Sequence, residues 1–454
     1  MPFPSIDPTT GEKWRTVPDQ TPEDVEHALD RAARARRTWG AAPVVERAAV
    51  LDAIGRELRT RAHDDAVVMA REMGKPVRDG EAEIEKCAVA CDYYAEHAER
   101  LLEPDPRDVD GARAYVRFDP LGTVLAIMPW NYPFWQVVRC AVPALAAGNT
   151  VVLKHAENVP ACADALAQIV AAAGLPAGVF EVLHVARDRI EPVVADHRIH
   201  GVALTGSTGA GRAVARAAGQ ALKKTVLELG GSDAFLVLDD ADLDLAARVA
   251  ADARLVNAGQ SCIAAKRFIV MDAVAVPFVE RLIEAMRSRR QGNPLDHETE
   301  LGPLARHDLR DQLHRQVEAS VARGARRVLG GTVPPGPGAF YPPTVLLDVA
   351  LGMPAFDQET FGPVAAVVRA RDDDDAVALA NASPYGLGAS VCTRDATRAE
   401  RIAARLEAGT ICVNGQVRSD PRLPFGGVKQ SGYGRELSEY GLREFVNVKT
   451  VVLR

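Results

Sequence analysis

The sequence has no apolar run of about 18 residues, the length that a membrane-spanning helix requires. Its first residues, Met1 to Ser5, lack the basic and apolar regions of a secretory signal. A net charge of −7, without a basic stripe interleaved with aromatic residues, argues against a nucleic-acid partner. We therefore expect a cytoplasmic protein that binds neither a membrane nor a nucleic acid.

The seven cysteines form no Cys-x-x-Cys pair and no cluster with histidine at the spacing of a zinc site. An odd number of cysteines without such spacings does not predict a disulfide framework. We expect free thiols in a reducing compartment and no bound metal. The sequence also has no internal repeat and no long disordered linker.

The chain of 454 residues, with 47% apolar and 25% charged residues, suits two or three globular domains. Near the N-terminus, Thr21 to Asp24 predict the start of a helix that Gly40 ends: a capping residue, a proline and two acids. Two more helical segments follow, up to about His97, and their sequence indicates no chemistry.

From Gly122 onward, apolar runs alternate with helical stretches. The predicted strands are 123–128, 150–153, 179–183, 201–204 and 225–229. The predicted helices between them are 160–173, 190–197 and 210–221. This alternation predicts a doubly wound parallel sheet, which binds ligands at the carboxyl ends of its strands.

A second alternation runs from about residue 234 to Pro424, with strands at 267–271, 363–368 and 410–413. It predicts a second doubly wound α/β domain. Two further strands, 113–118 and 446–453, fall outside both patterns. We expect them to form an arm that pairs with another subunit, because isolated strands seek an edge.

A candidate nucleophile and a candidate base lie in neighbouring segments. Cys262 stands in the run Gly259–Ala264, and Glu228 is embedded in the apolar strand that precedes Gly230 and Gly231. A cysteine reacts as its thiolate, and a base activates it. Taken alone, Cys262 is more often a small buried hydrophobe and Glu228 a surface residue of an edge strand. Together with the motifs below, they favour catalysis.

Four further motifs lie beside predicted strands. Asn131, held between Pro129 and Pro133, offers a rigid amide donor for an oxyanion, although capping a turn is the simpler interpretation. Lys154 and Glu157 form either a surface ion pair or a ribose site. The remaining two motifs are the Gly-rich turn that contains Gly206 and Ser207, and the segment that contains Glu359 and Phe361.

The Gly-rich turn 205–212 suits a phosphate, because its amides open a helix. It does not match Gly-x-Gly-x-x-Gly, and it is not a P-loop, because Arg212 and Ala213 stand where Lys and Ser/Thr are needed. Glu359 and Phe361 join an acid and an aromatic ring, which suit a ribose and a flat ring.

In combination and order, the segments 227–231, 259–262 and 359–364 resemble the aldehyde dehydrogenase family. The resemblance covers nearly the whole chain, from Asp7 to Gly432. Segments 259–267 and 424–437 are most similar to the succinate-semialdehyde dehydrogenase branch. The implied fold is α/β, with two doubly wound domains and a small β arm for oligomerisation. The implied division is 1–112 and 122–231 for the dinucleotide, 232–424 for catalysis, and 113–121 and 435–454 for the arm.

The resemblance implies oxidation of an aldehyde to an acid. Cys262 forms a thiohemiacetal and then a thioester, Asn131 holds the oxyanion, and Glu228 activates the hydrolytic water. The implied cofactor residues are Trp130, Lys154, Glu157, Gly206, Ser207, Leu229, Glu359 and Phe361. NAD is expected over NADP, although NADP stays possible, because the Glu157 carboxylate accepts hydrogen bonds from ribose hydroxyls and repels a 2′-phosphate.

The resemblance also implies a carboxylate pocket for the substrate. Arg139 and Ser419 match positions that contact the distal carboxylate in succinate-semialdehyde enzymes, and Arg418 is a further candidate cation. Val256 stands where some of those enzymes have a second arginine, and Cys140 replaces a lysine that is common in the family. The alternative for Arg139 is an internal salt bridge on a helix.

The expected substrate is a small-molecule aldehyde, succinate semialdehyde. The expected protein partners are further copies of the chain, in a homodimer or homotetramer. Three alternatives remain open: a broad-specificity aldehyde dehydrogenase, a non-catalytic member of the fold, and a CoA-acylating enzyme. The presence of Cys262, Glu228 and Asn131 together argues against the second, and Glu228 argues against the third.

Overall fold

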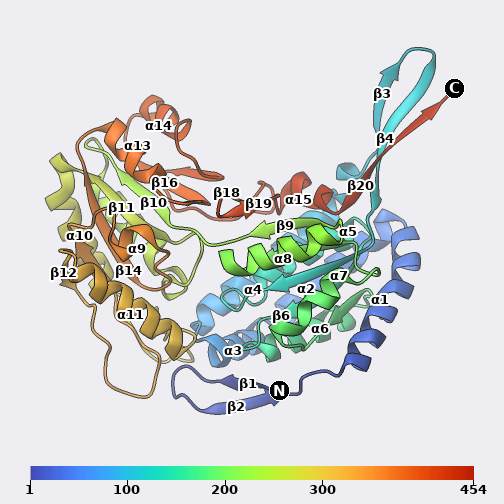
Figure 1. Ribbon diagram of the computed structural model, residues 1–454, viewed down its shortest axis with the longest axis horizontal. Helices are drawn as coiled ribbons and strands as arrows, with labels where there is room; N and C mark the ends of the chain where they lie inside the picture. The colour runs from blue at the N-terminus through green and yellow to red at the C-terminus, as the bar shows by residue number, and fades with distance from the viewer. Residues whose placement is uncertain (1) are drawn as a thin grey trace.

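The computed structural model describes residues 2–454, which form two α/β lobes and a projecting three-stranded arm (Figure 1). One lobe is built on a six-stranded sheet and the other on a seven-stranded sheet. An antiparallel hairpin of β1 (Phe3–Ile6) and β2 (Lys13–Val17), which the sequence did not predict, precedes the first helix.

Helix α1 (Pro22–Ala41) begins and ends close to the predicted residues. Thr21 Oγ1 accepts a hydrogen bond from the Asp24 amide, and the Asp24 carboxylate accepts one from the Thr21 amide. This capping box satisfies amides that have no partner within the helix. Val25 and Leu29 lie on the buried face, which packs against the six-stranded sheet.

Three helices follow α1, where the sequence predicted two: α2 (Val44–Thr60), α3 (Ala62–Met73) and α4 (Val77–Leu101). The prediction was wrong because only Arg61 separates α2 from α3, without a glycine or proline to mark the break. Gly74 ends α3 with a φ of 78°, a conformation that favours glycine. Helix α4 also brings side chains to the candidate site.

The six-stranded sheet has the order β19-β9-β8-β5-β6-β7, so the chain winds outward from β5 in both directions. All neighbours are parallel except β19, which pairs antiparallel with β9. The strands are β5 (Thr123–Met128), β6 (Thr150–His155), β7 (Phe180–Val182), β8 (Gly201–Thr205), β9 (Lys224–Glu228) and β19 (Gly432–Tyr433). The helices are α5 (Trp135–Ala146), α6 (Pro160–Ala172), α7 (Ile190–Ala195) and α8 (Thr208–Gln220).

The register of this sheet places the ends of four strands at one edge. Ile127 of β5 pairs with Lys154 of β6, and Thr205 of β8 pairs with Glu228 of β9. The loop that contains Asn131 follows β5 at the same edge. The candidate side chains of this lobe therefore lie at the carboxyl ends of parallel strands, where such sheets bind ligands.

The seven-stranded sheet has the order β12-β13-β14-β11-β10-β16-β17, and only β12 runs antiparallel to its neighbour. The strands are β10 (Asp233–Val237), β11 (Ala265–Met271), β12 (Arg326–Leu329), β13 (Thr344–Leu347), β14 (Val364–Ala370), β16 (Gly388–Cys392) and β17 (Thr410–Val413). The helices are α9 (Leu243–Leu255), α10 (Ala275–Arg287), α11 (His307–Val321), α12 (Pro354–Asp357), α13 (Asp373–Asn381) and α14 (Ala396–Ala403).

The arm is a three-stranded antiparallel sheet of order β20-β4-β3. Strand β4 (Ala112–Pro120) pairs with β20 (Val446–Leu453) and with β3 (Asp105–Val109), a strand that the sequence did not reveal. The two predicted arm strands therefore pair with each other within one chain. Figure 1 shows the arm projecting from the lobe of the six-stranded sheet, with the C-terminus at its end. Helix α15 (Ser438–Glu444) precedes β20.

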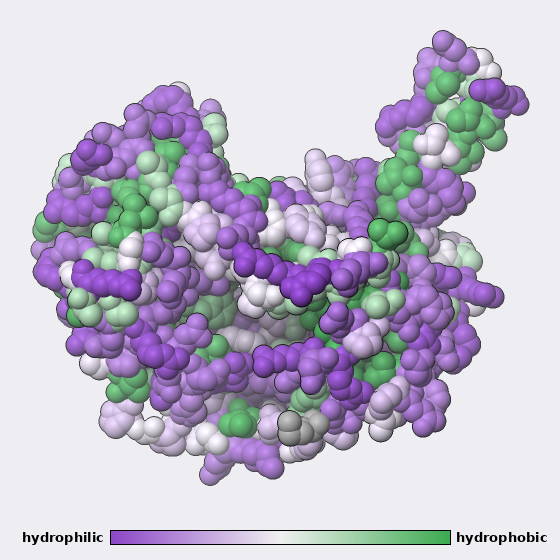
Figure 2. All heavy atoms as spheres, in the orientation of Figure 1, coloured by the Kyte–Doolittle hydropathy of each residue, from purple (hydrophilic) through white to green (hydrophobic). Residues whose placement is uncertain are grey.

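Apolar clusters cover both faces of each large sheet. The largest cluster joins α2, α3, α4 and α5 to one face of the six-stranded sheet. In the space-filling view the surface is mainly hydrophilic, with apolar side chains gathered along the arm (Figure 2). Across residues 2–454, no helix has the length and apolar character that crossing a membrane requires.

Candidate active site

Cys262 lies in the short loop between the 3-10 turn η2 (Val256–Gly259) and β11, and it lines two cavities. The larger cavity has a volume of about 520 Å³ and the smaller one of about 410 Å³. Cys262 and Gln136 belong to the walls of both. Cys262 is half-buried, and it lies where the two cavities adjoin.

The backbone before Cys262 is strained. Asn257 and Ala258 have φ of 53° and 55°, and Gly259 follows with 77°. Non-glycine residues in this region cost about 1–3 kcal/mol and persist only where neighbours hold them. Arg254 supplies part of that support, because its Nη2 donates to the Gly259 carbonyl at 2.7 Å. A Cβ on Gly259 would lie 2.3 Å from the Gly362 carbonyl oxygen, so the position requires glycine.

Lys266 holds the backbone of the loop from the buried side. Its Nζ donates to the carbonyls of Ser261 at 2.8 Å and Cys262 at 2.6 Å. The same ammonium lies 3.7 Å from Glu359 Oε1. Burial lowers the pKa of Lys266, and the Glu359 carboxylate opposes this. This role was not predicted, because Lys266 stands inside an ordinary apolar strand.

Asn131 joins the loop after β5 to the loop of the cysteine. Its Nδ2 donates to the Gln260 carbonyl at 3.0 Å, and Asn257 Nδ2 donates to the Asn131 carbonyl at 2.7 Å. Asn131 lines the smaller cavity beside Cys262. One N–H of its amide is engaged by Gln260, and the second is available to a ligand.

Glu83 fixes the start of α5, a few residues beyond Asn131. Its Oε1 accepts from the amides of Phe134 and Trp135, both at 2.9 Å, and the carboxylate pairs with Lys75. A carboxylate at a helix N-terminus satisfies free amides and interacts favourably with the helix dipole. Glu83 and Lys75 are both buried in the wall of the larger cavity.

Glu228 lies at the end of β9 and is 2% exposed. Neither carboxylate oxygen has a hydrogen-bond partner among the described residues. The carboxyl group lies against Gly426, where an added Cβ would approach Glu228 Oε1 to 2.8 Å. Burial raises its pKa well above the ordinary value; Arg139 opposes the shift and Glu436 adds to it. Glu228 is not among the described residues that line the two cavities.

Burial raises the pKa of the Cys262 thiol to about 12, although Arg139 and Lys266 oppose the shift. The thiol is therefore protonated at neutral pH in this state. Because the thiolate is the reactive form, the site requires a base to accept the proton. Glu228, whose raised pKa makes its ionised form a stronger base, is suited to this requirement.

Six of the eight predicted cofactor residues line the smaller cavity: Trp130, Gly206, Ser207, Leu229, Glu359 and Phe361. The rings of Trp130 and Phe361 meet edge to face with centroids 5.7 Å apart. Ser207 caps α8, since its Oγ accepts from the Ala210 amide at 3.3 Å. The cavity thus combines a helix N-terminus, two aromatic rings and a carboxylate beside the thiol, a donor set that fits a dinucleotide with a flat ring.

The other two predicted cofactor residues lie outside that cavity wall. Lys154 Nζ and Glu157 Oε1 are 3.8 Å apart at the end of β6. Glu157 Oε1 also accepts from the Arg187 amide at 2.9 Å. Lys154 is buried, and burial lowers its pKa while Glu157 opposes this. The pair and the smaller cavity share one edge of the sheet.

All three predicted substrate residues line the larger cavity: Arg139, Arg418 and Ser419. Arg139 is 2% exposed, forms an ion pair with Glu436, and lies with its guanidinium carbon 4.6 Å from the centroid of the Phe425 ring. The structure therefore contains the salt bridge that was the alternative for Arg139, within the wall of the cavity. Glu436 was not identified from the sequence.

Sequence reasoning also missed Lys86 of α4 and Gln136 of α5, which line the larger cavity. Lys86 Nζ donates to Ser419 Oγ at 2.7 Å across 333 positions of sequence. Gln136 is buried, and its Oε1 has no hydrogen-bond partner among residues 2–454. Charged residues that recur on one face of a helix are usually solvated, so the sequence offered no signal for Lys86.

No group of three or more His, Cys, Asp or Glu side chains in the described part of the chain is arranged to hold a metal ion. The seven cysteines are all free. Cys140 is buried, and burial raises the pKa of its thiol well above the ordinary value.

Comparison with known proteins identifies the class. The model of the Aldehyde dehydrogenase family matches residues 1–451. The chain is 49% identical over 447 residues to succinate semialdehyde dehydrogenase [NAD(P)+] Sad of Escherichia coli (strain K12), covering 98% of this chain and 97% of that protein. It is 46% identical over 454 residues to succinate-semialdehyde dehydrogenase [NADP(+)] 1 of Mycobacterium tuberculosis (strain ATCC 25618 / H37Rv), covering 99% of each.

Solved structures have the same fold. Succinic semialdehyde dehydrogenase from Streptococcus pyogenes, in complex with NADP+, has a TM-score of 0.97 at 38% identity, covering 99% of each chain. Lactaldehyde dehydrogenase from Escherichia coli has a TM-score of 0.97 at 35% identity, covering 100% of this chain and 96% of that one. The protein belongs to the aldehyde dehydrogenase family, and the predicted family and fold class are confirmed.

We predict that Gly259→Ala lowers kcat/KM for any aldehyde substrate about 100-fold, because a shift of about 1 Å in a reacting group costs this much. The added methyl group meets the Gly362 carbonyl and must displace the loop of Cys262. The measurement is steady-state kinetics on the folded variant.

Gly219→Ala in α8 is the matched control, because a Cβ there meets nothing within 4 Å. It should keep the wild-type kcat/KM. Wild-type kinetics in Gly259→Ala would contradict the close packing described for the loop.

Proposed function

We propose that this protein oxidises an aldehyde with a distal carboxylate, succinate semialdehyde, to the dicarboxylic acid, with NAD preferred as the oxidant. One observation carries the proposal: Cys262 stands in the walls of both cavities. The larger cavity is lined by cationic side chains, which suit a carboxylate. The smaller one has the donors that suit a dinucleotide.

The relatives support the substrate. Those of 46–49% identity over nearly the whole chain are named as succinate-semialdehyde dehydrogenases. The fold alone does not decide the matter, because a lactaldehyde dehydrogenase has the same fold at 35% identity. Arg139, Arg418 and Ser419 of the larger cavity are the residues proposed to contact the substrate.

In the first step, Cys262 Sγ bonds to the aldehyde carbon as the thiol proton passes to a base, and a thiohemiacetal oxyanion forms. The free N–H of the Asn131 amide and the backbone N–H of Cys262 are the proposed donors to this oxyanion. The hydrogen bond from Asn131 to Gln260 fixes the amide before substrate binds. Lys266 likewise fixes the backbone of Cys262 through its carbonyl.

A dinucleotide, when bound, would supply the oxidant as the acceptor of the hydride that leaves the thiohemiacetal. In the last step, water adds to the thioester carbonyl, the C–S bond breaks, and the thiol of Cys262 regains its proton. Glu228 is the proposed base for that water, because burial makes its carboxylate hold a proton strongly. Because Glu228 lines neither of the two cavities that contain Cys262, its carboxyl group would have to move from its position against Gly426 to reach that water.

The proposed cofactor contacts divide between two places. In the smaller cavity, Trp130, Leu229, Glu359 and Phe361 would hold the nicotinamide ring and its ribose, and Gly206 and Ser207 would hold the pyrophosphate. Lys154 and Glu157 would hold the adenosine ribose. The carboxylate of Glu157 disfavours a 2′-phosphate, which supports NAD over NADP, whereas Lys154 and the nearby Arg187 favour the phosphate.

We expect initial rates of dinucleotide reduction to give a kcat/KM at least about tenfold higher for succinate semialdehyde than for butanal, since one charged hydrogen bond is worth this much. The four-carbon aldehydes differ in the distal carboxylate. The same assay with NAD and NADP is expected to favour NAD.

Equal kcat/KM for both aldehydes would support the broad-specificity alternative instead. A preference for NADP would show that Glu157 does not exclude the 2′-phosphate. The two comparisons are independent, so one half of the proposal can fail while the other stands.

Cys262→Ala is expected to abolish turnover. Glu228→Gln should still form product dinucleotide in a single-turnover burst but slow the steady state by about 10²–10⁴-fold, because general-base catalysis contributes this much. Stopped-flow absorbance separates the two phases. Glu99→Gln, an exposed position on α4, is the matched control.

A full steady-state rate in Glu228→Gln would remove Glu228 from the hydrolytic step. Residual turnover in Cys262→Ala would assign the chemistry to another group.

We also propose that the protein is a homodimer or homotetramer that uses the arm. Val448 and Val452 of β20 are 61% and 47% exposed, and they lie on the same face of the strand. The outer edge of β20 has no neighbouring strand within residues 2–454. An exposed apolar strand with a free edge is suited to pair with a second copy.

The free cysteines support a reducing cytoplasm as the location of the protein.

The double variant Val448→Asp/Val452→Asp is expected to lower the mass found by sedimentation equilibrium. Charges on this exposed face of β20 would oppose association with a second copy. Val45→Asp, at a 64% exposed position of α2, should leave the mass unchanged. A wild-type chain that is monomeric at micromolar concentration would contradict the proposal.

A further inference from the structure

Lys86 lines the larger cavity and is held there by two neighbouring side chains. It projects from α4 into the cavity that also contains Cys262. Its Nζ donates to Ser419 Oγ at 2.7 Å and lies 4.3 Å from the centroid of the Trp135 ring. The ring face and the hydroxyl hold the ammonium in one position.

The other cations of this cavity wall, Arg418 excepted, have carboxylate partners. Lys75 pairs with Glu83 and Arg139 with Glu436; Arg78 pairs with Asp79, and Arg289 with Asp252 and Glu300. Lys86 forms no ion pair with a carboxylate of residues 2–454, and neither does Arg418. Arg418 is exposed, so water screens its charge, whereas Lys86 is half-buried.

A partly dehydrated charge without a counter-ion is costly, and proteins usually pair it. Burial lowers the pKa of Lys86 to about 8, and the neighbouring Arg139 and Arg418 contribute to the decrease. Glu83 and Cys87 act in the opposite direction. The ammonium is therefore still mainly charged at pH 7, and it is available to an anion in the cavity.

Ser419 also requires an acceptor from the cavity. Its Oγ accepts from Lys86 Nζ at 2.7 Å and from Trp135 Nε1 at 3.1 Å, which occupies both lone pairs. The hydroxyl hydrogen has no acceptor among the described residues, although Ser419 is only 7% exposed. An acceptor must come from the cavity, and a carboxylate is purely an acceptor.

We propose that Lys86 is the principal anchor of the substrate carboxylate, with one carboxylate oxygen bound by the Lys86 ammonium and the other by the Ser419 hydroxyl. The inference rests on the proposed function, and it names a specificity-determining residue for it. Arg139, whose charge is shared with Glu436, is then a secondary contact of the carboxylate. Trp135 is a positioning residue, because its Nε1 donates to Ser419 Oγ and its ring lies against the Lys86 ammonium.

The test compares Lys86→Met, which removes the charge but keeps the length, with Lys86→Arg, which keeps the charge. Lys86→Met is expected to lower kcat/KM for succinate semialdehyde about 10- to 100-fold, the range of one hydrogen bond to a charged group. The loss should appear mainly in KM. Butanal should change less than about threefold, and Lys86→Arg should restore part of the preference.

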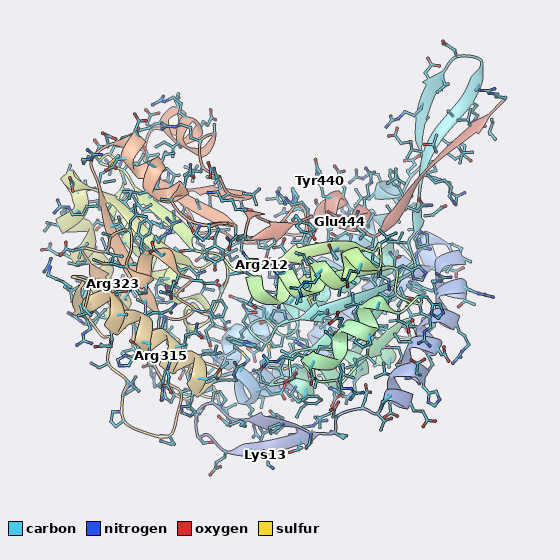
Figure 3. All side chains as sticks on the ribbon, in the orientation of Figure 1. Lys13, Arg212, Arg315, Arg323, Tyr440 and Glu444 are labelled. Atoms are coloured by element: carbon cyan, nitrogen blue, oxygen red, sulfur yellow. The ribbon has the colours of Figure 1, made fainter. Side chains whose placement is uncertain are left out.

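Lys13→Met is the matched control, because Lys13 is exposed on the hairpin at the far edge of the molecule from the arm (Figure 3). It should behave as the wild type with both aldehydes. If the wild type itself does not prefer succinate semialdehyde, the proposed substrate fails. If the wild type prefers it and Lys86→Met keeps that preference, the anchor fails and the proposed substrate stands.

A second measurement does not depend on turnover. Succinate should raise the thermal unfolding midpoint of the wild type at pH 7 and not that of Lys86→Met. Because the Lys86 pKa is lowered to about 8, the shift should decrease as pH rises from 7 to 9, while the ammonium loses its proton. The charged and titratable groups around it are Glu83, Cys87, Arg139, Arg418 and Asp420.

Of these neighbours, Asp420 has a pKa lowered by its hydrogen bonds with Arg422, and Cys87 has a pKa raised well above the ordinary value by burial, so neither changes its charge over that range. Equal succinate shifts in wild type and Lys86→Met, or no shift in the wild type, would overturn the anchor.

Discussion

The hydrogen bonds from Lys266 to the carbonyls of Ser261 and Cys262 are the contact on which the rest of the site depends. They place the reactive sulfur at the boundary of two cavities, although the backbone before it is strained. The same ammonium lies beside Glu359, a residue of the smaller cavity. A buried charge thus joins the position of Cys262 to the wall of the smaller cavity, and any change in the pair of Lys266 and Glu359 affects both.

Much of the framework was predictable from local pattern. Strand β5 was predicted with the residues that it has, and β6, β8, β9 and β17 within about two residues at each end, because buried parallel strands appear as short apolar runs. Asn131, Gly206 and Glu359 were identified because each follows or precedes such a strand, and Cys262 because the run Gly259–Ala264 comes soon after a strand that carries Glu228. Those four residues line one cavity between the two sheets: Asn131 and Gly206 follow β5 and β8 of the six-stranded sheet, and Cys262 and Glu359 precede β11 and β14 of the seven-stranded sheet.

The site residues that were not predicted from the sequence take their roles from contacts between segments far apart in the chain. Lys86 meets Ser419 across 333 positions, and Glu436 meets Arg139 across nearly 300. On a helix such as α4, a lysine that faces a cavity has the same local sequence as one that faces water. The break between α2 and α3 was missed for a related reason, since Arg61 carries no turn signal. Pattern reveals which elements form, and packing decides which faces they present.

Gln136 has a consequence for how the two cavities are filled. Its side chain belongs to the walls of both cavities, and its buried Oε1 has no partner among the described residues. One amide cannot orient itself for two occupants independently, so an occupant that binds Gln136 in one cavity would alter the free energy of filling the other. Thermodynamic linkage would make this coupling reciprocal, because each occupant would change the affinity of the other by the same factor. Gln136, which the walls of both cavities share, would carry this coupling.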